Sequence, residues 1–299
     1  MKSISVPWTR RLFNEACPCG SGSKSYECCW AGDGRWEKTP VAATPLPVTS
    51  VPPFINERCY LSSYGDCGTK ITKEHFISRT VLERVTTDKL TIENAGHIFG
   101  GKNKVEIGVD SFAAKVLCDV HNPSLSALDT AIGIAFANMD ALAKNMEKTA
   151  DASKHIRSFH ISSGLDIERW MIKVYCGLVA AGAIRSSSEK VVGRDAVTSI
   201  LLDALVGKSS LPTPLGLYHH AFTGQTRSLG RVVSIGTIRL TDGSDDVGGL
   251  LLTLGPINFV LITSMEFGRT FKEPNWYRHP TILINLKQGN ARIAYFLTY

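Results

Sequence analysis

Eight cysteines constrain the fold of this 299-residue chain more than any other feature, because four of them lie between Cys17 and Cys29. The first residues contain no apolar stretch of the kind that a secretory signal needs, so we expect a cytoplasmic location in which thiols stay reduced. In a reducing compartment, clustered cysteines favour metal binding over disulfides. The adjacent pair Cys28 and Cys29 suits a tetrahedral thiolate site for zinc better than a disulfide framework.

The segment from Cys17 to Cys29 reads CPCGSGSKSYECC, and its glycines allow the backbone to turn tightly around an ion. It resembles the SEC-C zinc motif, which is found at the C-terminus of the SecA translocation motor. Ser23 replaces the first lysine of that motif, and no departure affects a ligand. The resemblance implies a small zinc knuckle over residues 1–38, with structural Zn²⁺ on Cys17, Cys19, Cys28 and Cys29. The alternative, a redox thiol cluster, is disfavoured because a closed set of four ligands leaves no open coordination position.

A proline-rich segment follows the knuckle. Residues 39–53 read TPVAATPLPVTSVPP and contain five prolines among small side chains. This composition is typical of a semi-extended spacer. We therefore expect a linker over residues 39–54 that separates the knuckle from the body of the protein.

A second set of metal-binding side chains comes after the linker. Cys59, Cys67, Cys118 and His121 make a plausible Cys₃His tetrahedron for a second structural Zn²⁺. A Cys-x₂-His pair at the start of a helix is a common way to close such a site. We expect that helix over residues 124–142, because apolar residues recur there at steps of three and four. They are Leu125, Leu128, Ile132, Phe136, Met139 and Leu142.

An acid–histidine pair, Glu74-His75, lies between the two ligand pairs, and Asn122 directly follows the last ligand. This order resembles the zinc-containing HNH, or ββα-metal, nucleases. The similarity spans about residues 55–140, and the domain that it implies covers residues 55–150. It implies that His75 is the general base and that Glu74 and Asn122 hold a catalytic Mg²⁺ or Mn²⁺. It also implies an endonuclease that hydrolyses nucleic acid, DNA in preference to RNA, of a kind that often serves in bacterial phage defence.

The residue types suit this chemistry, because histidine titrates near neutral pH and can activate water. Oxygen ligands such as those of Glu74 and Asn122 are the ones that a hard divalent cation prefers. Three features depart from the family pattern: the seven-residue spacing of the first cysteine pair, glutamate where aspartate is commonest, and the long segment 79–116. They leave open a second interpretation, a non-catalytic zinc-binding scaffold with two structural sites.

The rest of the chain predicts an α+β protein. Residues 151–210 form a helical region, with helices expected from Asp166, which would cap the first, to Ala183 and from Asp195 to Val206. Residues 211–299 alternate apolar and polar side chains between turn residues, which predicts an antiparallel β unit. Its expected strands are Arg231–Leu240, Leu250–Leu254, Phe259–Thr263, Thr281–Leu286 and Arg292–Thr298.

The net charge of +6 is a modest excess, which permits contact with nucleic acid without requiring it. No run of 18 apolar residues is present, so we expect no membrane partner. A protein partner would bind through the SEC-C motif or through the C-terminal β unit.

Overall fold

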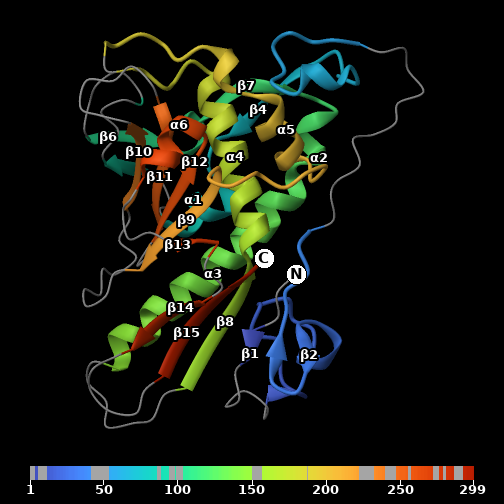
Figure 1. Ribbon diagram of the computed structural model, residues 1–299, viewed down its shortest axis with the longest axis vertical. Helices are drawn as coiled ribbons and strands as arrows, with labels where there is room; N and C mark the ends of the chain where they lie inside the picture. The colour runs from blue at the N-terminus through green and yellow to red at the C-terminus, as the bar shows by residue number, and fades with distance from the viewer. Residues whose placement is uncertain are drawn as a thin grey trace.

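The computed structural model confirms a mixed α+β architecture (Figure 1). The residues that it describes are 4–5, 12–41, 54–85, 89–93, 98, 104–149, 157–186, 188–221, 232–239, 247–254, 257–271, 276–278, 281–285 and 292–299. Among them, no helix is long and apolar enough to cross a lipid bilayer.

The largest sheet has seven strands and combines the C-terminal β unit with two earlier strands. In spatial order it contains β13 (Trp276–Tyr277), β9 (Gly216–Ala221), β12 (Ile257–Ile262), β11 (Val247–Leu254), β10 (Val232–Arg239), β5 (Lys89–Glu93) and β6 (Lys104–Gly108). All pairs are antiparallel except β10 with β5. The sheet therefore ties the C-terminal β unit to the segment between the two halves of the second metal-ligand set.

Three smaller sheets complete the strand pairing. One is ordered β14 (Thr281–Asn285), β15 (Arg292–Thr298), β8 (Arg157–Ser163), with β15 and β8 parallel. A hairpin-like pair joins β4 (Ile71–His75) to β7 (Ala113–Cys118), and the knuckle has β1 (Ile4–Ser5), β3 (Arg35–Trp36) and β2 (Trp30–Gly32). Among the described residues of 211–299, every strand pair is antiparallel, as predicted, and the parallel pairs link this unit to strands earlier in the chain.

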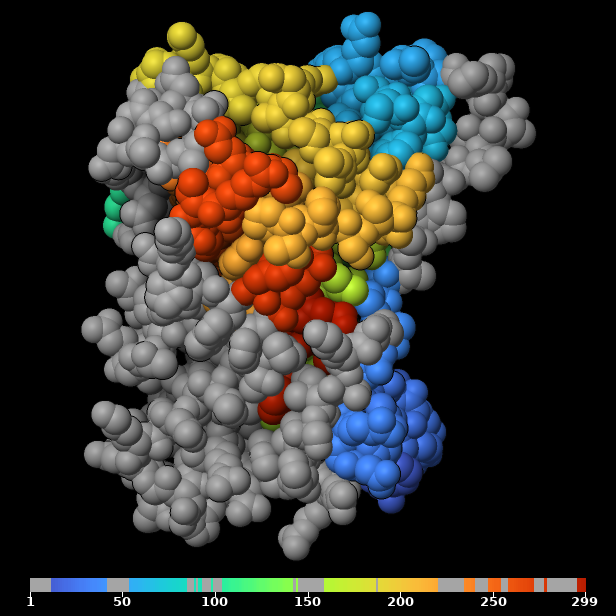
Figure 2. Space-filling view, viewed as in Figure 1, coloured from blue at the N-terminus to red at the C-terminus, as the bar shows by residue number. Residues whose placement is uncertain are grey.

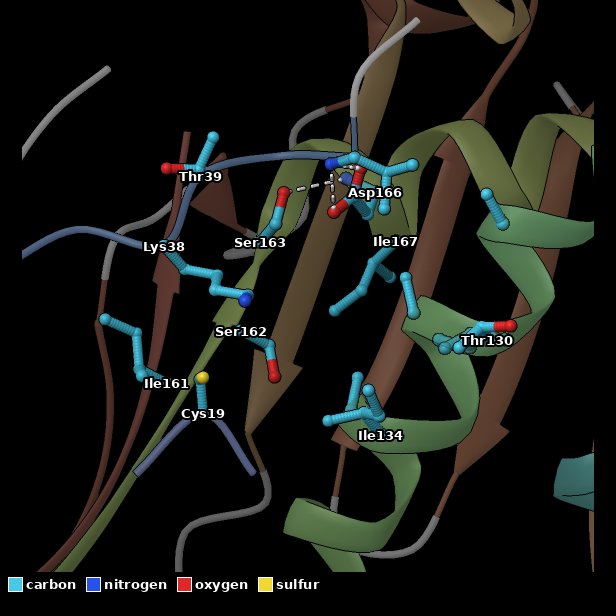
Figure 3. Close-up of a pocket in the computed structure, with 15 residues that line it drawn as sticks. Cys19, Lys38, Thr39, Thr130, Ile134, Ile161, Ser162, Ser163, Asp166 and Ile167 are labelled. Carbon is cyan, nitrogen blue, oxygen red and sulfur yellow. Dashed lines mark hydrogen bonds between the residues drawn. The ribbon is translucent and has the colours of Figure 1, made fainter. Parts of the chain in front are cut away.

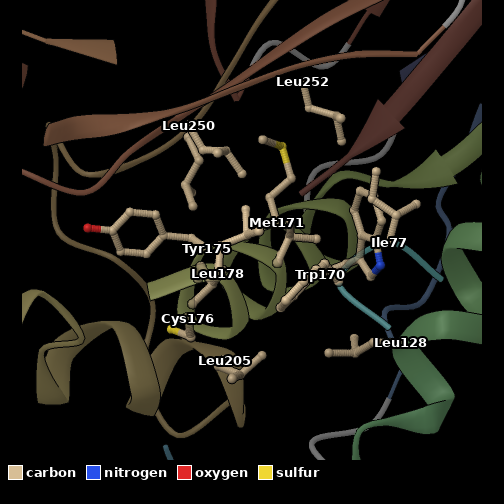
Figure 4. Close-up of a cluster of buried hydrophobic side chains, with 14 of the residues drawn as sticks. Ile77, Leu128, Trp170, Met171, Tyr175, Cys176, Leu178, Leu205, Leu250 and Leu252 are labelled. Atoms are coloured by element: carbon tan, nitrogen blue, oxygen red, sulfur yellow. The ribbon is translucent and has the colours of Figure 1, made fainter. Parts of the chain in front are cut away.

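Two long helices, α3 (Ser126–Thr149) and α4 (Gly164–Ala180), form the centre of the molecule. The predicted apolar stripe of α3 is buried from Leu128 to Met139, whereas α4 is buried on nearly all sides, as expected of a helix inside a core. Figure 4 shows Trp170, Met171 and Tyr175 of α4 within the cluster that includes Leu250 and Leu252 of β11. The thiol of Cys176 is fully buried here.

Short helices complete the fold. They are α1 (Arg79–Val85), α2 (His121–Ser124), α5 (Ser199–Leu205) and α6 (Met265–Thr270). The N-cap of α4 is Ser163 and not Asp166 as expected, because the Ser163 hydroxyl accepts a hydrogen bond from the Asp166 backbone N–H at 3.1 Å. The helix α5 likewise begins later than expected, at Ser199, with Thr198 as its N-cap. Asp195, the expected start, lies in a short 3₁₀ helix over Arg194–Ala196.

The knuckle packs directly against the body, beside β8 and β15 (Figure 1), and Figure 2 shows its surface at the lower right. The ring of Trp36 is fully buried and meets Phe159 edge-on at 4.9 Å between centroids. The backbone N–H of Ile161 donates to Pro18 O at 3.2 Å, and Asn138 Nδ2 donates to Cys19 O at 3.1 Å. The expected linker lies mostly outside the described residues, and the knuckle that precedes it is docked on the body.

A cavity of about 430 Å³ lies where the knuckle, α3, β8 and the start of α4 meet (Figure 3). The residues after the knuckle close one side, because both oxygens of Asp166 accept the backbone N–H of Val41 at 3.0 Å. Thr298 completes this contact by donating to Lys38 O at 3.1 Å. The division of the chain into domains at residues 38, 54, 150 and 210 stays a prediction. The contacts described above connect residues from all of these segments.

Candidate metal centres

The four cysteines of the knuckle converge on one point. Their sulfur atoms all lie within 4.8 Å of one another, and three of the four residues are buried. Cys28 Sγ is 3.5 Å from Cys19 Sγ and 3.6 Å from Cys29 Sγ. A zinc ion bonded to sulfur at about 2.3 Å requires sulfur–sulfur separations of about 3.8 Å in a tetrahedron. The cluster therefore has both the donor set and the spacing that structural zinc needs.

Hydrogen bonds among the cysteines of this cluster shift their pKa values in opposite directions, raising those of Cys17 and Cys29 and lowering that of Cys19. Hydrogen bonds from Cys17 and Cys29 lower the pKa of Cys19 well below its usual range. Burial alone would lower the pKa of Lys38, but the thiolates of Cys19, Cys29 and Cys28 raise it. Lys38 therefore supplies a positive charge beside a site that carries a net negative charge when four thiolates bind one Zn²⁺.

The second set brings together four residues that are far apart in the chain, and they are the four that the sequence predicts. Nδ1 of His121 lies 3.2 Å from Cys118 Sγ, 3.4 Å from Cys59 Sγ and 3.8 Å from Cys67 Sγ. All four residues are buried, and their ligand atoms lie within 4.8 Å of one another. This Cys₃His donor set also fits a structural zinc ion.

The second set has a supporting carboxylate that the sequence analysis missed. Oδ1 of Asp66 lies 2.9 Å from Nε2 of His121, the ring nitrogen that faces away from the sulfur atoms. Burial lowers the pKa of His121, with Asp66 opposing it, so the neutral ring can present Nδ1 to a metal. Zinc-bound histidines usually donate their second N–H to such a group. The only sequence signal was the position of Asp66 next to Cys67.

The second ligand set lies beside the strand that carries Glu74 and His75, because Cys118 ends β7, the partner of β4. Glu74 and His75 end β4, and adjacent residues of a strand face opposite sides of the sheet. Glu74 is buried, while His75 is 23% exposed. The strand therefore directs the two predicted catalytic side chains to different environments.

Glu74 pairs with a lysine. Its Oε1 forms an ion pair with Nζ of Lys173 on α4, which is 2% exposed and also lies 2.6 Å from Oδ2 of Asp129. Burial raises the pKa of Glu74 to about 7, although Lys173 opposes this effect. An ammonium group thus sits where the expected divalent ion would bind, so Glu74 in this arrangement does not fit Mg²⁺ or Mn²⁺. Neither Asp129 nor Lys173 carries a signal in the sequence.

Asn122 connects α2 to β4. Its Nδ2 donates to Oγ1 of Thr72 at 2.9 Å and to the backbone oxygen of Lys73 at 3.0 Å. These bonds fix the helix that carries His121 against the strand that carries His75. The structure thus gives Asn122 a positioning role next to the second zinc site.

His75 faces a polar surface. Its Nε2 lies 3.9 Å from Oδ1 of Asp110, and Nη1 of Arg79 is 3.6 Å from the same oxygen. Burial, and then Arg79, lowers the pKa of His75, so the ring is neutral near pH 7 and can accept a proton. Lys73 pairs with Lys115 across β4 and β7, and both are exposed. Because residues two apart share a face of a strand, these lysines lie on the same face as His75.

Comparison with known proteins found no match: no family model fits the chain, and neither a curated protein nor a solved structure resembles it. The SEC-C and HNH resemblances therefore rest on the residues quoted for them. What the structure shows is two Cys/His clusters with the donors and spacing for zinc.

Proposed function

We propose that this protein is an HNH-like endonuclease with two structural zinc ions, the second of which holds His75 at a basic surface. The observation that carries the proposal is the position of His75, a partly exposed residue at the end of β4, next to the strand β7 that supplies the ligand Cys118. The zinc site fixes β7 and α2, and Asn122 fixes α2 to β4. A histidine in such a rigid frame is suited to general base catalysis.

The proposed reaction is hydrolysis of a phosphodiester. His75 takes a proton from water, the resulting hydroxide attacks phosphorus, and the bond from phosphorus to the leaving oxygen breaks. The proton held by His75 then neutralises the departing alkoxide, either directly or through solvent. Asp110, 3.9 Å from the ring, stabilises the imidazolium, and Arg79 offers its guanidinium to the phosphate oxygens.

The surface around His75 suits a polyanion. Lys73, Lys115 and Arg79 are all exposed. Asp110 opposes them, and so does Glu83, whose Oε1 accepts from Nε of Arg79 at 2.7 Å. Lysine and arginine side chains bind phosphates of either nucleic acid, and they do not select a base sequence. The preference for DNA and a role in bacterial phage defence follow from the HNH resemblance alone.

A second function is a non-catalytic zinc scaffold, which one observation favours. Glu74, the residue expected to bind the catalytic ion, is instead buried in an ion pair with Lys173. Under this interpretation, the docked knuckle and the large sheet would present surfaces to a protein partner. The scaffold would need His75 only for packing.

Cleavage of supercoiled plasmid and of single-stranded RNA separates the two functions. The zinc-loaded protein would be assayed with and without added Mg²⁺ or Mn²⁺, beside His75→Ala and a control, Lys144→Ala. Lys144 is an exposed lysine of α3, paired with Asp140. The nuclease requires cleavage by wild type and control and its loss in His75→Ala at equal zinc content. Equal cleavage by His75→Ala, or none by wild type, would contradict the proposal.

A further inference from the structure

A buried lysine lies between two carboxylates on the inner side of β4. Lys173 of α4 is 2% exposed, and its Nζ contacts Oε1 of Glu74 and, at 2.6 Å, Oδ2 of Asp129. The three residues come from a strand and two helices, so three elements converge on one cation. A lysine this deep in a protein is rare unless its charge is paired, and here it is paired twice.

The second carboxylate is held by its own partners. Ser78 Oγ donates to Oδ1 of Asp129, and Trp170 Nε1 donates to Ser78 Oγ at 2.9 Å. Trp170 is fully buried and Ser78 nearly so. The orientation of Asp129 is therefore fixed by a packed indole as well as by the lysine, in the way that outer residues orient the ligands of a metal.

Above the raised pKa of Glu74, about 7, both carboxylates are ionised, and the charges do not balance with lysine alone. Two carboxylates and one ammonium leave one negative charge, whereas a divalent ion would neutralise both carboxylates. Convergent carboxylate oxygens are also the ligands that Mg²⁺ and Mn²⁺ prefer. Lysine differs from them as a single point charge that a covalent stem delivers to the site.

We propose that Lys173 substitutes for the divalent cation of the HNH-like site, so that Glu74 and Asp129 bind Mn²⁺ only when this lysine is removed. The wild-type protein then holds its two zinc ions without a divalent ion at Glu74. This proposal rests on the proposed function only where it concerns hydrolysis. The metal-binding part is tested by a binding measurement, without a cleavage assay.

The experiment is a titration of the zinc-loaded protein with Mn²⁺ at pH 8, in which free Mn²⁺ is measured by electron paramagnetic resonance. The control is Lys144→Ala, which removes an exposed lysine that also lies 2.6 Å from an aspartate. In wild type and in this control, we expect no Mn²⁺ binding that depends on Glu74. Lys173→Ala is expected to bind about one equivalent, and Lys173→Ala/Glu74→Gln to lose it. Mn²⁺ binding by wild type that Glu74→Gln abolishes would overturn the proposal, and so would a folded Lys173→Ala that binds none.

Removal of Lys173 leaves two buried carboxylates without their cation, so the variant needs a second measurement. If Lys173→Ala does not fold in zinc alone, it would be refolded with added Mn²⁺ and followed by far-UV circular dichroism. Recovery of the native spectrum in Mn²⁺ supports the proposal, and failure to recover overturns it. Neither result depends on cleavage of nucleic acid, so loss of the proposed nuclease function would leave this proposal standing.

Discussion

Asp66 Oδ1 lies 2.9 Å from Nε2 of His121, while Nδ1 of the same ring faces the sulfur atoms of Cys118, Cys59 and Cys67. The carboxylate thus fixes which ring nitrogen is available to the metal. It also links the second zinc site to the loop between Cys59 and β4. The loop contributes a ligand at Cys67 and a supporting group one residue earlier.

Replacement of Asp66 should weaken zinc binding at the second site. Asp66→Ala removes the acceptor that orients His121, and losses of such partners reduce metal affinity about 10- to 100-fold. Competition with a chromogenic chelator would measure the change, and the first site should release its zinc as in wild type. Unchanged affinity would show that the ring is oriented by its packing alone.

The docked knuckle should stabilise the whole fold. Trp36→Ala removes a fully buried ring that contacts Phe159, and such truncations cost about 3–5 kcal/mol. Chemical denaturation of the zinc-loaded protein would detect this loss. Trp30→Ala is the matched control, because this partly buried ring meets the rings of Phe13 and Trp36, both in the knuckle, at 6.0 and 5.0 Å between centroids. An equal effect of both variants would contradict docking as the source of the stability.

Stability should fall as the pH rises from about 4.5 to 7, through Glu74. Burial raises its pKa from 4.5 to about 7 in the folded protein, so between these values the folded state holds a proton that the unfolded state has released. The unfolding free energy should therefore decrease by on the order of 3 kcal/mol across this window. Glu74→Gln, which mimics the protonated acid, should remove this part of the pH dependence. An unchanged profile in Glu74→Gln would assign the dependence to other groups.

The basic face around His75 should bind nucleic acid through phosphates. Replacing Lys73 and Lys115 together by glutamate should lower the affinity for every sequence and reduce the slope of log affinity against log salt by about 2. Fluorescence anisotropy over a salt series would measure both, with Lys144→Glu as the exposed control. If the control weakens binding as much as the double variant, contact is not centred on this face.

The sequence analysis predicted the two Cys/His clusters because metal chemistry restricts residue types and local spacing. Cys118 and His121 are three residues apart before a helix, so periodicity and ligand spacing place them together. The buried stripe of α3 from Leu128 to Met139 follows from the same local rule. The five predicted strands of the C-terminal unit appear as β10, β11, β12, β14 and β15.

What local patterns do not contain is the pairing of distant elements. Lys173 reads as one polar residue of a helix, and only the packing of α4 against β4 and α3 places it between Glu74 and Asp129. The parallel pairs β10–β5 and β15–β8 likewise join strands separated by whole helices. The docking of the knuckle was missed because a proline-rich segment predicts separation, whereas Trp36 buries its ring against Phe159 before that segment begins.

The most direct test of the two-centre architecture is the zinc content of the purified protein, measured by inductively coupled plasma mass spectrometry. We expect about two zinc ions per chain, one for each cluster. Cys19→Ser and Cys118→Ser should each lose one ion and leave the other in place. Fewer than two ions in the folded wild type, or loss of both ions in either variant that remains folded, would contradict two independent structural zinc sites.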